Sequence, residues 1–483
     1  MPRIGLVGPS YRSQAVNAAC QLTLNWYPEV IEPGNDKVPM ALYPTPGTTV
    51  FAAGLVGAKG RGIIETNGRV FVVISTKLYE LFANGTNIER ATVADDGLPV
   101  SMAVSQIELC VVSAGTMYVM NLATAVVTTI AAATWAPEAG VKQVVFIDGF
   151  FIALLLNSQK FRISAALNGL SWPGVQVIQV SVFPDEVLAI VASHRELGVA
   201  GRTKSVVYYD SGSSQIFDVV PGSLIEQGIG AALAMNNLDN TVFWLGGDDR
   251  GDMVAYRLQG YTPTRVSTHA VEHAWQGYAV RSDAVSYSYQ DQGHLFWVVY
   301  FPTANKTWVY DVATQMWHER GFLENGVVVA HRSWDHTFAF GKHLVVSHAD
   351  ANIYEMSINF YDDAGTAIRR VRRCPHLSDE DAWSFHHRLQ LAMEVGLGPQ
   401  PPLLDGNGQP RDPEVMLRWS DDGGHTWSNE HVRGVGQAGE YRKRVIWNQL
   451  GRTRDRVYEV SATDPIPWRL LDAWLKASPG NGA

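Results

Sequence analysis

Eight residues near the C-terminus combine side chains that could bind a ligand or build a polar turn. Residues 420–427 read SDDGGHTW, and the pattern S-x-D-x-G-x-T-W is formed by Ser420, Asp422, Gly424, Thr426 and Trp427. In such a turn the Asp carboxylate accepts backbone N–H bonds, the glycine permits a tight backbone and the Trp packs against the domain. None of these roles needs a substrate.

The same pattern resembles the Asp-box of sialidases and other β-propeller glycan hydrolases. Those enzymes repeat the box on several blades and carry out catalysis elsewhere, with clustered arginines and a Tyr/Glu pair. Here the box occurs once, and it follows the repeats described below. We therefore predict a structural hairpin and no catalytic residue, and we retain an Asp-box glycan hydrolase or a glycan-binding adhesin as the alternative function.

Two further short patterns could hold metal ions. His269 and His273 stand in HAVEH, which matches the H-x-x-E-H pattern of inverted zinc proteases. A helix there would be short, would begin after Ser267 or Thr268, and would lack a third ligand. The turn 246–252, GGDDRGD, contains an RGD tripeptide and three carboxylates without the ligand spacing of a calcium loop. We expect a surface helix and a hairpin tip, with no metal ion and no cofactor.

Basic residues are dense in the C-terminal part of the chain. They could contact DNA phosphates, bind an acidic partner subunit, or protect strand edges from unwanted pairing. The formal net charge of the chain is −9, which favours a protein partner over nucleic acid. The predicted partner-contact cluster consists of Arg369, Arg370, Arg372, Arg373, Arg442, Lys443 and Arg444.

The elements that position these residues follow from composition. Hydrophobic residues make up 46% and charged residues 18% of the 483 residues, with 44 Gly and 23 Pro, a profile of many short strands joined by tight turns. The three cysteines are widely spaced, so we expect buried, reduced thiols and neither a disulfide framework nor a metal site. No secretory signal and no membrane-spanning apolar run is expected.

Turn dipeptides recur at intervals of roughly one propeller blade, about 40 to 50 residues. Asn67-Gly68 and Asp148-Gly149 are the clearest, because these pairs favour the positive φ of a two-residue hairpin. Weaker centres lie near Ser105-Gln106, His194-Arg195, Asp239-Asn240, Gln292-Gly293 and Gly341-Lys342. The pattern predicts an all-β fold with a β-propeller of six or seven blades over residues 59–365.

Past residue 365 the pattern changes to strict alternation. Apolar and polar residues alternate over 385–395, which predicts a strand with one buried face. A Pro/Gly-rich linker and further strand-like runs follow. We expect residues 366–483 to form an antiparallel β-sandwich that carries the Asp-box hairpin, and residues 1–58 to be an irregular segment packed on the propeller.

Three stretches of the chain resemble the tail hub proteins of short-tailed phages, a family of packaged-DNA stabilisation proteins. They are the segment NWYPEVIEPGNDKVPMALYPTPGTTVF at 25–51, EVLAIVASHRELGVAGRTKSVVYYDSGS at 186–213, and GEYRKRVIWNQLGRTRDRVYEVSATDPIPWRLLDAWL at 439–475. The third is the most specific. Because the stretches lie at the beginning, middle and end, the resemblance spans nearly the whole chain.

This resemblance implies a structural, non-enzymatic protein of the virion tail, assembled in the host cytoplasm. It implies a homo-hexameric hub or nozzle that docks below the portal–adaptor ring protein and extends the DNA channel. Double-stranded DNA would pass through without sequence-specific binding. The hub would help retain the packaged genome and anchor tail needle, spike or fibre proteins for genome ejection. The Asp-box loop and the Pro-rich linker have no counterpart in this family pattern, so the identity of the attached proteins stays open.

Overall fold

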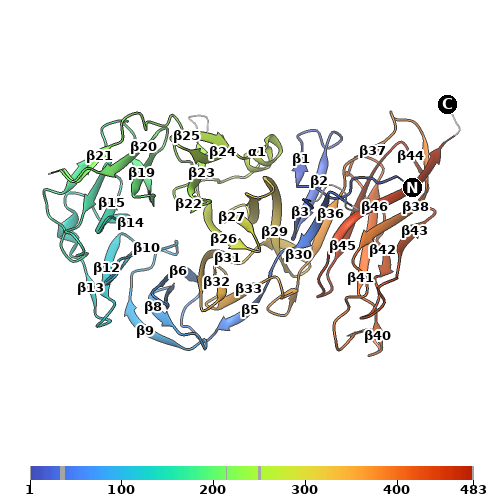
Figure 1. Ribbon diagram of the computed structural model, residues 1–483, viewed down its shortest axis with the longest axis horizontal. Helices are drawn as coiled ribbons and strands as arrows, with labels where there is room; N and C mark the ends of the chain where they lie inside the picture. The colour runs from blue at the N-terminus through green and yellow to red at the C-terminus, as the bar shows by residue number, and fades with distance from the viewer. Residues whose placement is uncertain (1, 33–37, 214, 248–251, 481–483) are drawn as a thin grey trace.

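The computed structural model describes residues 2–32, 38–213, 215–247 and 252–480, which are almost entirely β-sheet (Figure 1). Seven four-stranded blades form a ring, and a two-sheet sandwich stands beside it. The prediction of a propeller followed by a sandwich is confirmed, and the described residues form seven blades. The helical elements of these residues are the 3₁₀-helix η1 (Ala132–Trp135) and the helix α1 (His269–Gln276).

Each blade is an antiparallel sheet whose first strand lines the axis of the ring. The first three blades consist of β6 (Gly60–Thr66), β7 (Arg69–Ile74), β8 (Lys77–Leu81) and β9 (Asn87–Thr92); β10 (Ser101–Val104), β11 (Glu108–Ser113), β12 (Thr116–Asn121) and β13 (Val127–Thr129); and β14 (Val141–Ile147), β15 (Phe150–Leu155), β16 (Lys160–Ile163) and β17 (Val177–Gln179).

The next three blades continue in chain order. They consist of β18 (Val187–Ser193), β19 (Glu196–Gly201), β20 (Ser205–Asp210) and β21 (Phe217–Val219); β22 (Met235–Leu238), β23 (Thr241–Gly247), β24 (Met253–Gln259) and β25 (Thr262–Arg265); and β26 (Val285–Asp291), β27 (His294–Phe301), β28 (Lys306–Asp311) and β29 (Met316–Glu324), to which β30 (Val327–Ala330) is added.

The seventh blade is built from both ends of the propeller sequence. Its strands are β31 (Ser333–Ala339), β32 (Lys342–Ser347), β33 (Ile353–Ser357) and, from the N-terminal segment, β5 (Gly47–Ala52), with β34 (Asp362–Asp363) and β35 (Thr366–Ala367) at its edge. Strand β5 pairs with β33 from Gly47–Ser357 to Ala52–Ile353. The ring is therefore closed by a strand that precedes the first blade in the sequence.

All seven predicted turns connect the first and second strands of a blade. Asn67 and Gly68 have φ of 51° and 76°, and Asp148 and Gly149 have φ of 49° and 90°, as a two-residue hairpin requires. In the seventh blade the turn is Phe340-Gly341, one residue earlier than predicted.

The sandwich also uses the N-terminal segment. One sheet contains β36 (Arg370–Arg373), β45 (Asp455–Ala462), β41 (Glu414–Ser420) and β42 (His431–Gly434), joined by β1 (Tyr11–Arg12), β2 (Cys20–Leu24) and β37 (Leu377–Ser378). The other contains β3 (Trp26–Val30), β4 (Met40–Pro44), β46 (Leu470–Pro479), β38 (Ser384–Met393), β43 (Val445–Asn448) and β44 (Arg452–Thr453). The strands β39 (Leu403–Leu404) and β40 (Pro410–Arg411) form a separate hairpin.

The expectation of an irregular N-terminal segment is thus wrong for the strands β1 to β5, which lie within residues 11–52. Trp26 and Leu42 lie in the sandwich core with Trp447 and Trp468, and the Trp26 Nε1–H donates to the Trp468 carbonyl at 3.0 Å. Apart from the local pairs β1–β2 and β3–β4, the partners of these strands lie hundreds of residues away, which short-range patterns cannot reveal. The limits at residues 58 and 365 remain our proposal for dividing the chain.

The two domains are joined by one continuous sheet through β29 of the sixth blade, β2 and β36, and β3 of the other sandwich sheet contacts β29 beside it. We call these four strands the joint. Leu24 on β2 pairs with Glu319 on β29, and Leu22–Leu24 pair with Val371–Arg373 on β36. Asn25, which is buried and has φ of 55°, exchanges hydrogen bonds with Gly321 and donates to the Arg369 carbonyl at 2.8 Å. The joint therefore holds propeller and sandwich through backbone pairing as well as through side chains.

Candidate functional site

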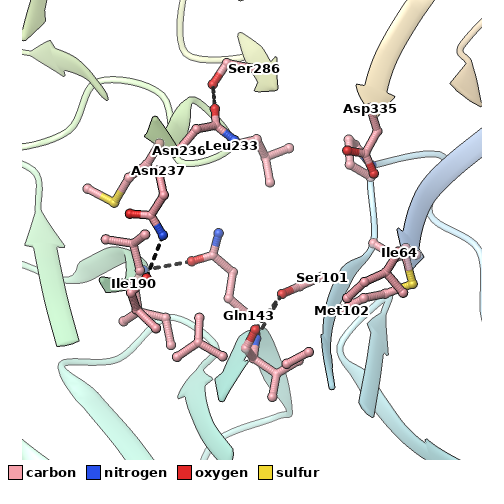
Figure 2. A pocket seen from close by; sticks show the side chains of 18 of the residues that line it. Ile64, Ser101, Met102, Gln143, Ile190, Leu233, Asn236, Asn237, Ser286 and Asp335 are labelled. Carbon is pink, nitrogen blue, oxygen red and sulfur yellow. Dashed lines mark hydrogen bonds between the residues drawn. The ribbon is translucent and has the colours of Figure 1, made fainter. Parts of the chain in front are cut away.

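The axial cavity of the propeller is lined by the first strand of every blade (Figure 2). Its volume is about 470 Å³, and its polar side chains include Ser101, Gln143, Asn237 and Asp335. Each of these four side chains forms a hydrogen bond with the backbone of an adjacent blade. The Ser101 Oγ accepts from Val144 N at 3.0 Å, and the Gln143 Oε1 accepts from Ile190 N at 2.9 Å.

The other two side chains continue this pattern around the ring. The Asn237 Nδ2 donates to the Ala192 carbonyl at 2.6 Å, and the Asp335 Oδ2 accepts from Ile63 N at 2.8 Å, which links the last blade to the first. Burial raises the pKa of Asp335 to about 6, against the opposing effect of the two backbone N–H groups that it accepts from. The polar groups of the cavity thus serve to hold neighbouring blades together.

The Asp-box turn directs its polar groups inward on itself. The Asp422 carboxylate accepts from the backbone N–H groups of His425 and Thr426 at 2.9 Å, and from the hydroxyls of Ser420 and Thr426 at 2.6 Å. These hydrogen bonds hold the pKa of Asp422 well below its usual range, and the bond from Ser420 contributes most. Gly424 has φ of 99°. This geometry agrees with the predicted structural role and leaves no carboxylate oxygen free of turn contacts.

Trp427 anchors the turn to the sandwich in a way that the sequence did not suggest. The guanidinium groups of Arg373 and Arg418 lie over its ring, at 4.6 and 4.9 Å from the ring centroid. Both guanidiniums bond the buried carboxylate of Glu459. Asp421 adds two bonds to Arg456, at 2.6 and 2.9 Å. The hairpin is therefore fixed to β36, β41 and β45 by paired charges.

The predicted basic cluster does not form one surface. Arg370 and Arg372 are fully buried on β36, so the expectation that they contact a partner is wrong. Arg372 donates to the carbonyls of Leu6 and Pro9 and to the side chains of Gln21 and Thr23, and burial lowers its pKa to about 10. It holds the N-terminal segment against β36.

The remaining members differ in exposure. Arg373 pairs with Glu459 at 2.7 Å, and Arg369 lies 3.6 Å from Glu430. Lys443 pairs with Asp412. Arg442 and Arg444 are exposed beside Tyr441, which is 70% exposed, so this short loop is the part of the cluster that remains available to a partner.

The HAVEH segment is the helix α1, as predicted. Glu272 points inward and bonds Arg265 at 2.7 and 2.6 Å, whereas His269 is 84% exposed. Thr268 caps the helix by accepting from Val271 N. Within the described ranges no three His, Cys, Asp or Glu side chains are grouped as metal ligands. In the turn 246–252, residues 248–251 lie outside the described residues.

A buried charge cluster at the joint was missed by the sequence analysis. His294 on β27 bonds Asp311 through Nδ1 at 2.8 Å and Glu29 on β3 through Nε2 at 2.5 Å. Burial alone would lower the pKa of His294, but the bonds and charges of the two carboxylates raise it to about 9. Glu29 lies in the NWYPE stretch, yet nothing in the sequence pairs it with a residue 265 positions later.

Comparisons with known proteins extend over both domains. The family model described as Bacteriophage P22 Gp10, beta-propeller, matches residues 6–361, and the one described as Bacteriophage P22 Gp10, beta-sandwich, matches residues 369–477. No curated protein sequence matches the chain. Among the described residues, no helix is long and apolar enough to cross a membrane.

Three solved structures are similar at low identity. They are the N-terminal domain of Nup159 (10% identity, 70% of this chain and 99% of that one, TM-score 0.41), YCF48 from Cyanidioschyzon merolae (11%, 64% and 98%, 0.42), and the extracellular domain of a putative hybrid two component system from B. thetaiotaomicron (8%, 64% and 39%, 0.43). With TM-scores below 0.5, none of the three bears on the function of this chain. The family matches do: the chain belongs to the bacteriophage P22 Gp10 family of phage tail structural proteins.

Proposed function

We propose that the protein is the hub or nozzle of a short-tailed phage. In this role, copies of the chain form a ring, hexameric by family resemblance, below the portal–adaptor ring. The ring extends the DNA channel, helps retain the packaged genome and anchors the needle, spike or fibre proteins used in ejection. The observation that supports it best is the family match to both domains, over residues 6–361 and 369–477.

The dimensions of the propeller support a channel between copies instead of one through a single chain. The axial cavity has a volume of about 470 Å³. A B-DNA duplex, whose major groove alone is about 12 Å wide, is too large for it. Several copies around a common axis could enclose a wider path. A net charge of −9 suits a channel along which DNA slides without sticking.

The joint supports the same role mechanically. Propeller and sandwich share one sheet through β29, β2 and β36, and Asn25 bonds both Gly321 on β29 and the Arg369 carbonyl next to β36. A chain that transmits contacts from an adaptor ring above to appendages below must keep its two domains in a defined relation. The alternative of a glycan hydrolase or adhesin gains nothing from the Asp-box, because the turn's polar groups bond one another.

Particles made without this chain test the proposal. We expect capsids that fill with DNA, lose it during purification and do not infect, with the chain supplied in trans restoring both properties. Imaging of complemented particles should locate the chain as a ring below the portal. Stable, infectious, DNA-filled particles in the absence of the chain would contradict the proposal.

A further inference from the structure

One end of the sandwich carries four cations with no acidic partner. Arg388 on β38, Lys476 on β46 and Arg452 with Arg454 near β44 form a surface that we call the basic end face. Arg388 and Lys476 occupy directly opposed positions on adjacent strands. Arg452 and Arg454 lie 3.9 and 4.7 Å from the ring centroid of Trp383. Among the described residues none of the four forms an ion pair, and the buried Nε of Arg388 has no hydrogen-bond partner.

This lack of partners distinguishes the face from the rest of the sandwich. Arg373 and Arg418 share Glu459, Arg456 binds Asp421, and Arg411 binds Asp464. Like charges directly opposite each other on neighbouring strands destabilise a sheet. Arg388 and Lys476 in that arrangement therefore indicate an anionic surface that approaches them from outside the chain.

The aromatic side chains here are those favoured at protein interfaces. Phe385 on β38 is 39% exposed, and Trp383 is half-buried beneath the two arginines. Interfaces are enriched in aromatic residues and arginine, whereas a purely electrostatic contact needs no exposed phenyl ring. The exposed acidic turn 379–381 borders the face, and no ion pair of the described residues joins the two.

The propeller region and the rest of the chain differ in net charge. Residues 47–365, which include the propeller, contain 19 Lys and Arg and 29 Asp and Glu, while the remaining residues contain 19 and 18. Strands β38, β43 and β44 lie at the edge of the sandwich farthest from the propeller (Figure 1). The acidic propeller of the same chain therefore cannot neutralise the basic end face, but the propeller of another copy can.

We propose that the basic end face docks on the acidic propeller of a second copy of this chain, head to tail. The two contacting surfaces are then different on each copy, and such heterologous contacts close into rings when the rotation between copies allows. The inference rests on the proposed function and adds to it the surface and the polarity through which the ring forms. Duplex DNA is the competing occupant, and the experiments below separate the two.

Zero-length cross-linking in tails isolated from particles that carry this chain tests the contact directly. A carbodiimide joins an amine to a carboxylate only when the two touch. We expect Lys476 to be linked to Asp or Glu residues between 47 and 365, and the position of Lys476 at the far end of the sandwich makes any such link one between copies. Lys476→Arg, which keeps the charge and removes the amine, should abolish the link while tails still assemble. Links from Lys476 to sandwich residues only would overturn the inference.

Charge reversal gives a second, independent readout. We expect Arg388→Glu with Lys476→Glu to reduce incorporation of the chain into tails at least tenfold, with an unchanged unfolding temperature of the purified chain. The matched control is Arg202→Glu with Arg281→Glu, an equal charge change at one exposed and one half-buried arginine of the propeller. It should assemble normally.

The outcomes separate the inference from the proposed function. If the reversed chain assembles into tails like the wild type, the head-to-tail contact is wrong and the hub proposal stands. If the reversed chain forms rings but no longer binds a 30-base-pair duplex that the wild type binds, the face serves DNA and the inference is overturned. If no wild-type chain is found in tails, the hub proposal itself fails.

Discussion

The Asp-box turn and the joint both concentrate hydrogen bonds on charged side chains, but they do so over very different lengths of chain. Every bond of Asp422 stays within residues 420–427. Arg372 instead bonds residues 6–23, and His294 bonds Glu29. The residues of a local turn are close in the sequence, so the motif can be recognised there. The residues of the joint are far apart in the sequence, and only the fold brings them together. The Asp-box turn is thus the most recognisable motif of this chain, but the contacts of the joint hold its distant segments together.

Replacing Arg372 should have the largest effect. Arg372→Met removes a buried cation that donates to Leu6, Pro9, Gln21 and Thr23, and leaves their oxygens without a donor. We expect the free energy of unfolding to fall by about 3 to 5 kcal/mol. Arg442→Met, at an exposed member of the same predicted cluster, should change it by less than about 0.5 kcal/mol. If urea unfolding gave equal decreases in the free energy of unfolding for Arg372→Met and Arg442→Met, buried and exposed members of the cluster would not differ in their contribution to stability.

Replacing His294 should have an intermediate effect that depends on pH. The pKa of His294 is raised from 6.5 to about 9, so its bonds to Glu29 and Asp311 stabilise the fold fully below pH 6.5, and this contribution is lost as the pH rises through 9. We expect His294→Gln to cost about 3 kcal/mol at pH 6. The difference from wild type should shrink steadily toward pH 10.

The control for His294 is a half-buried histidine without the carboxylate pair. Burial lowers the pKa of His348 below its usual value, and its Nε2–H donates to the His331 carbonyl rather than to an acid. His348→Gln should therefore show no loss of effect between pH 6 and pH 10. A His294→Gln penalty that is constant over this range would mean that packing, not charge, carries the contribution of His294.

Replacing Asp422 should have the smallest effect of the three. Asp422→Asn keeps the shape but weakens the bonds to Ser420, His425 and Thr426, and this loosens one exposed turn. Because the pKa of Asp422 is lowered, its contribution is present above the usual Asp pKa and is lost as the pH falls through the lowered value. Calorimetry at pH 7 should give a small decrease in unfolding temperature that vanishes in strong acid. A decrease as large as that for Arg372→Met would reverse the comparison.

The sequence predicts well those elements whose structure depends on neighbouring residues. Asn67-Gly68 and Asp148-Gly149 indicate hairpins because their residue types tolerate positive φ, and their recurrence indicates blades. The alternation over residues 385–395 indicates the strand β38 (Ser384–Met393), which buries Leu389 and Leu391 as expected, but a bulge between His386 and Arg388 buries His386 and exposes Phe385. The Asp-box turn has the bonds expected of it. All of these depend on neighbours within about ten residues.

What the sequence leaves hidden depends on distant partners. Arginine is almost never fully buried without a partner, so Arg370 and Arg372 suggest a surface, yet both are buried on β36. The segment 1–58 contains Pro and Gly and no clear period, and its strands β1 to β5 pair with one another and with strands beyond residue 300. The axial side chains Ser101, Gln143 and Asp335 bond across blades, which no spacing along the chain reveals.

The closure of the seventh blade by β5 has a consequence for biosynthesis. Residues 47–52 leave the ribosome early, but their partner β33 ends at Ser357. At about 5 to 20 residues per second, the early strand waits roughly 15 to 60 seconds before it can pair. During that interval an unpaired edge is exposed to other nascent chains. Slower elongation should therefore lengthen the period during which aggregation competes with closure of the propeller.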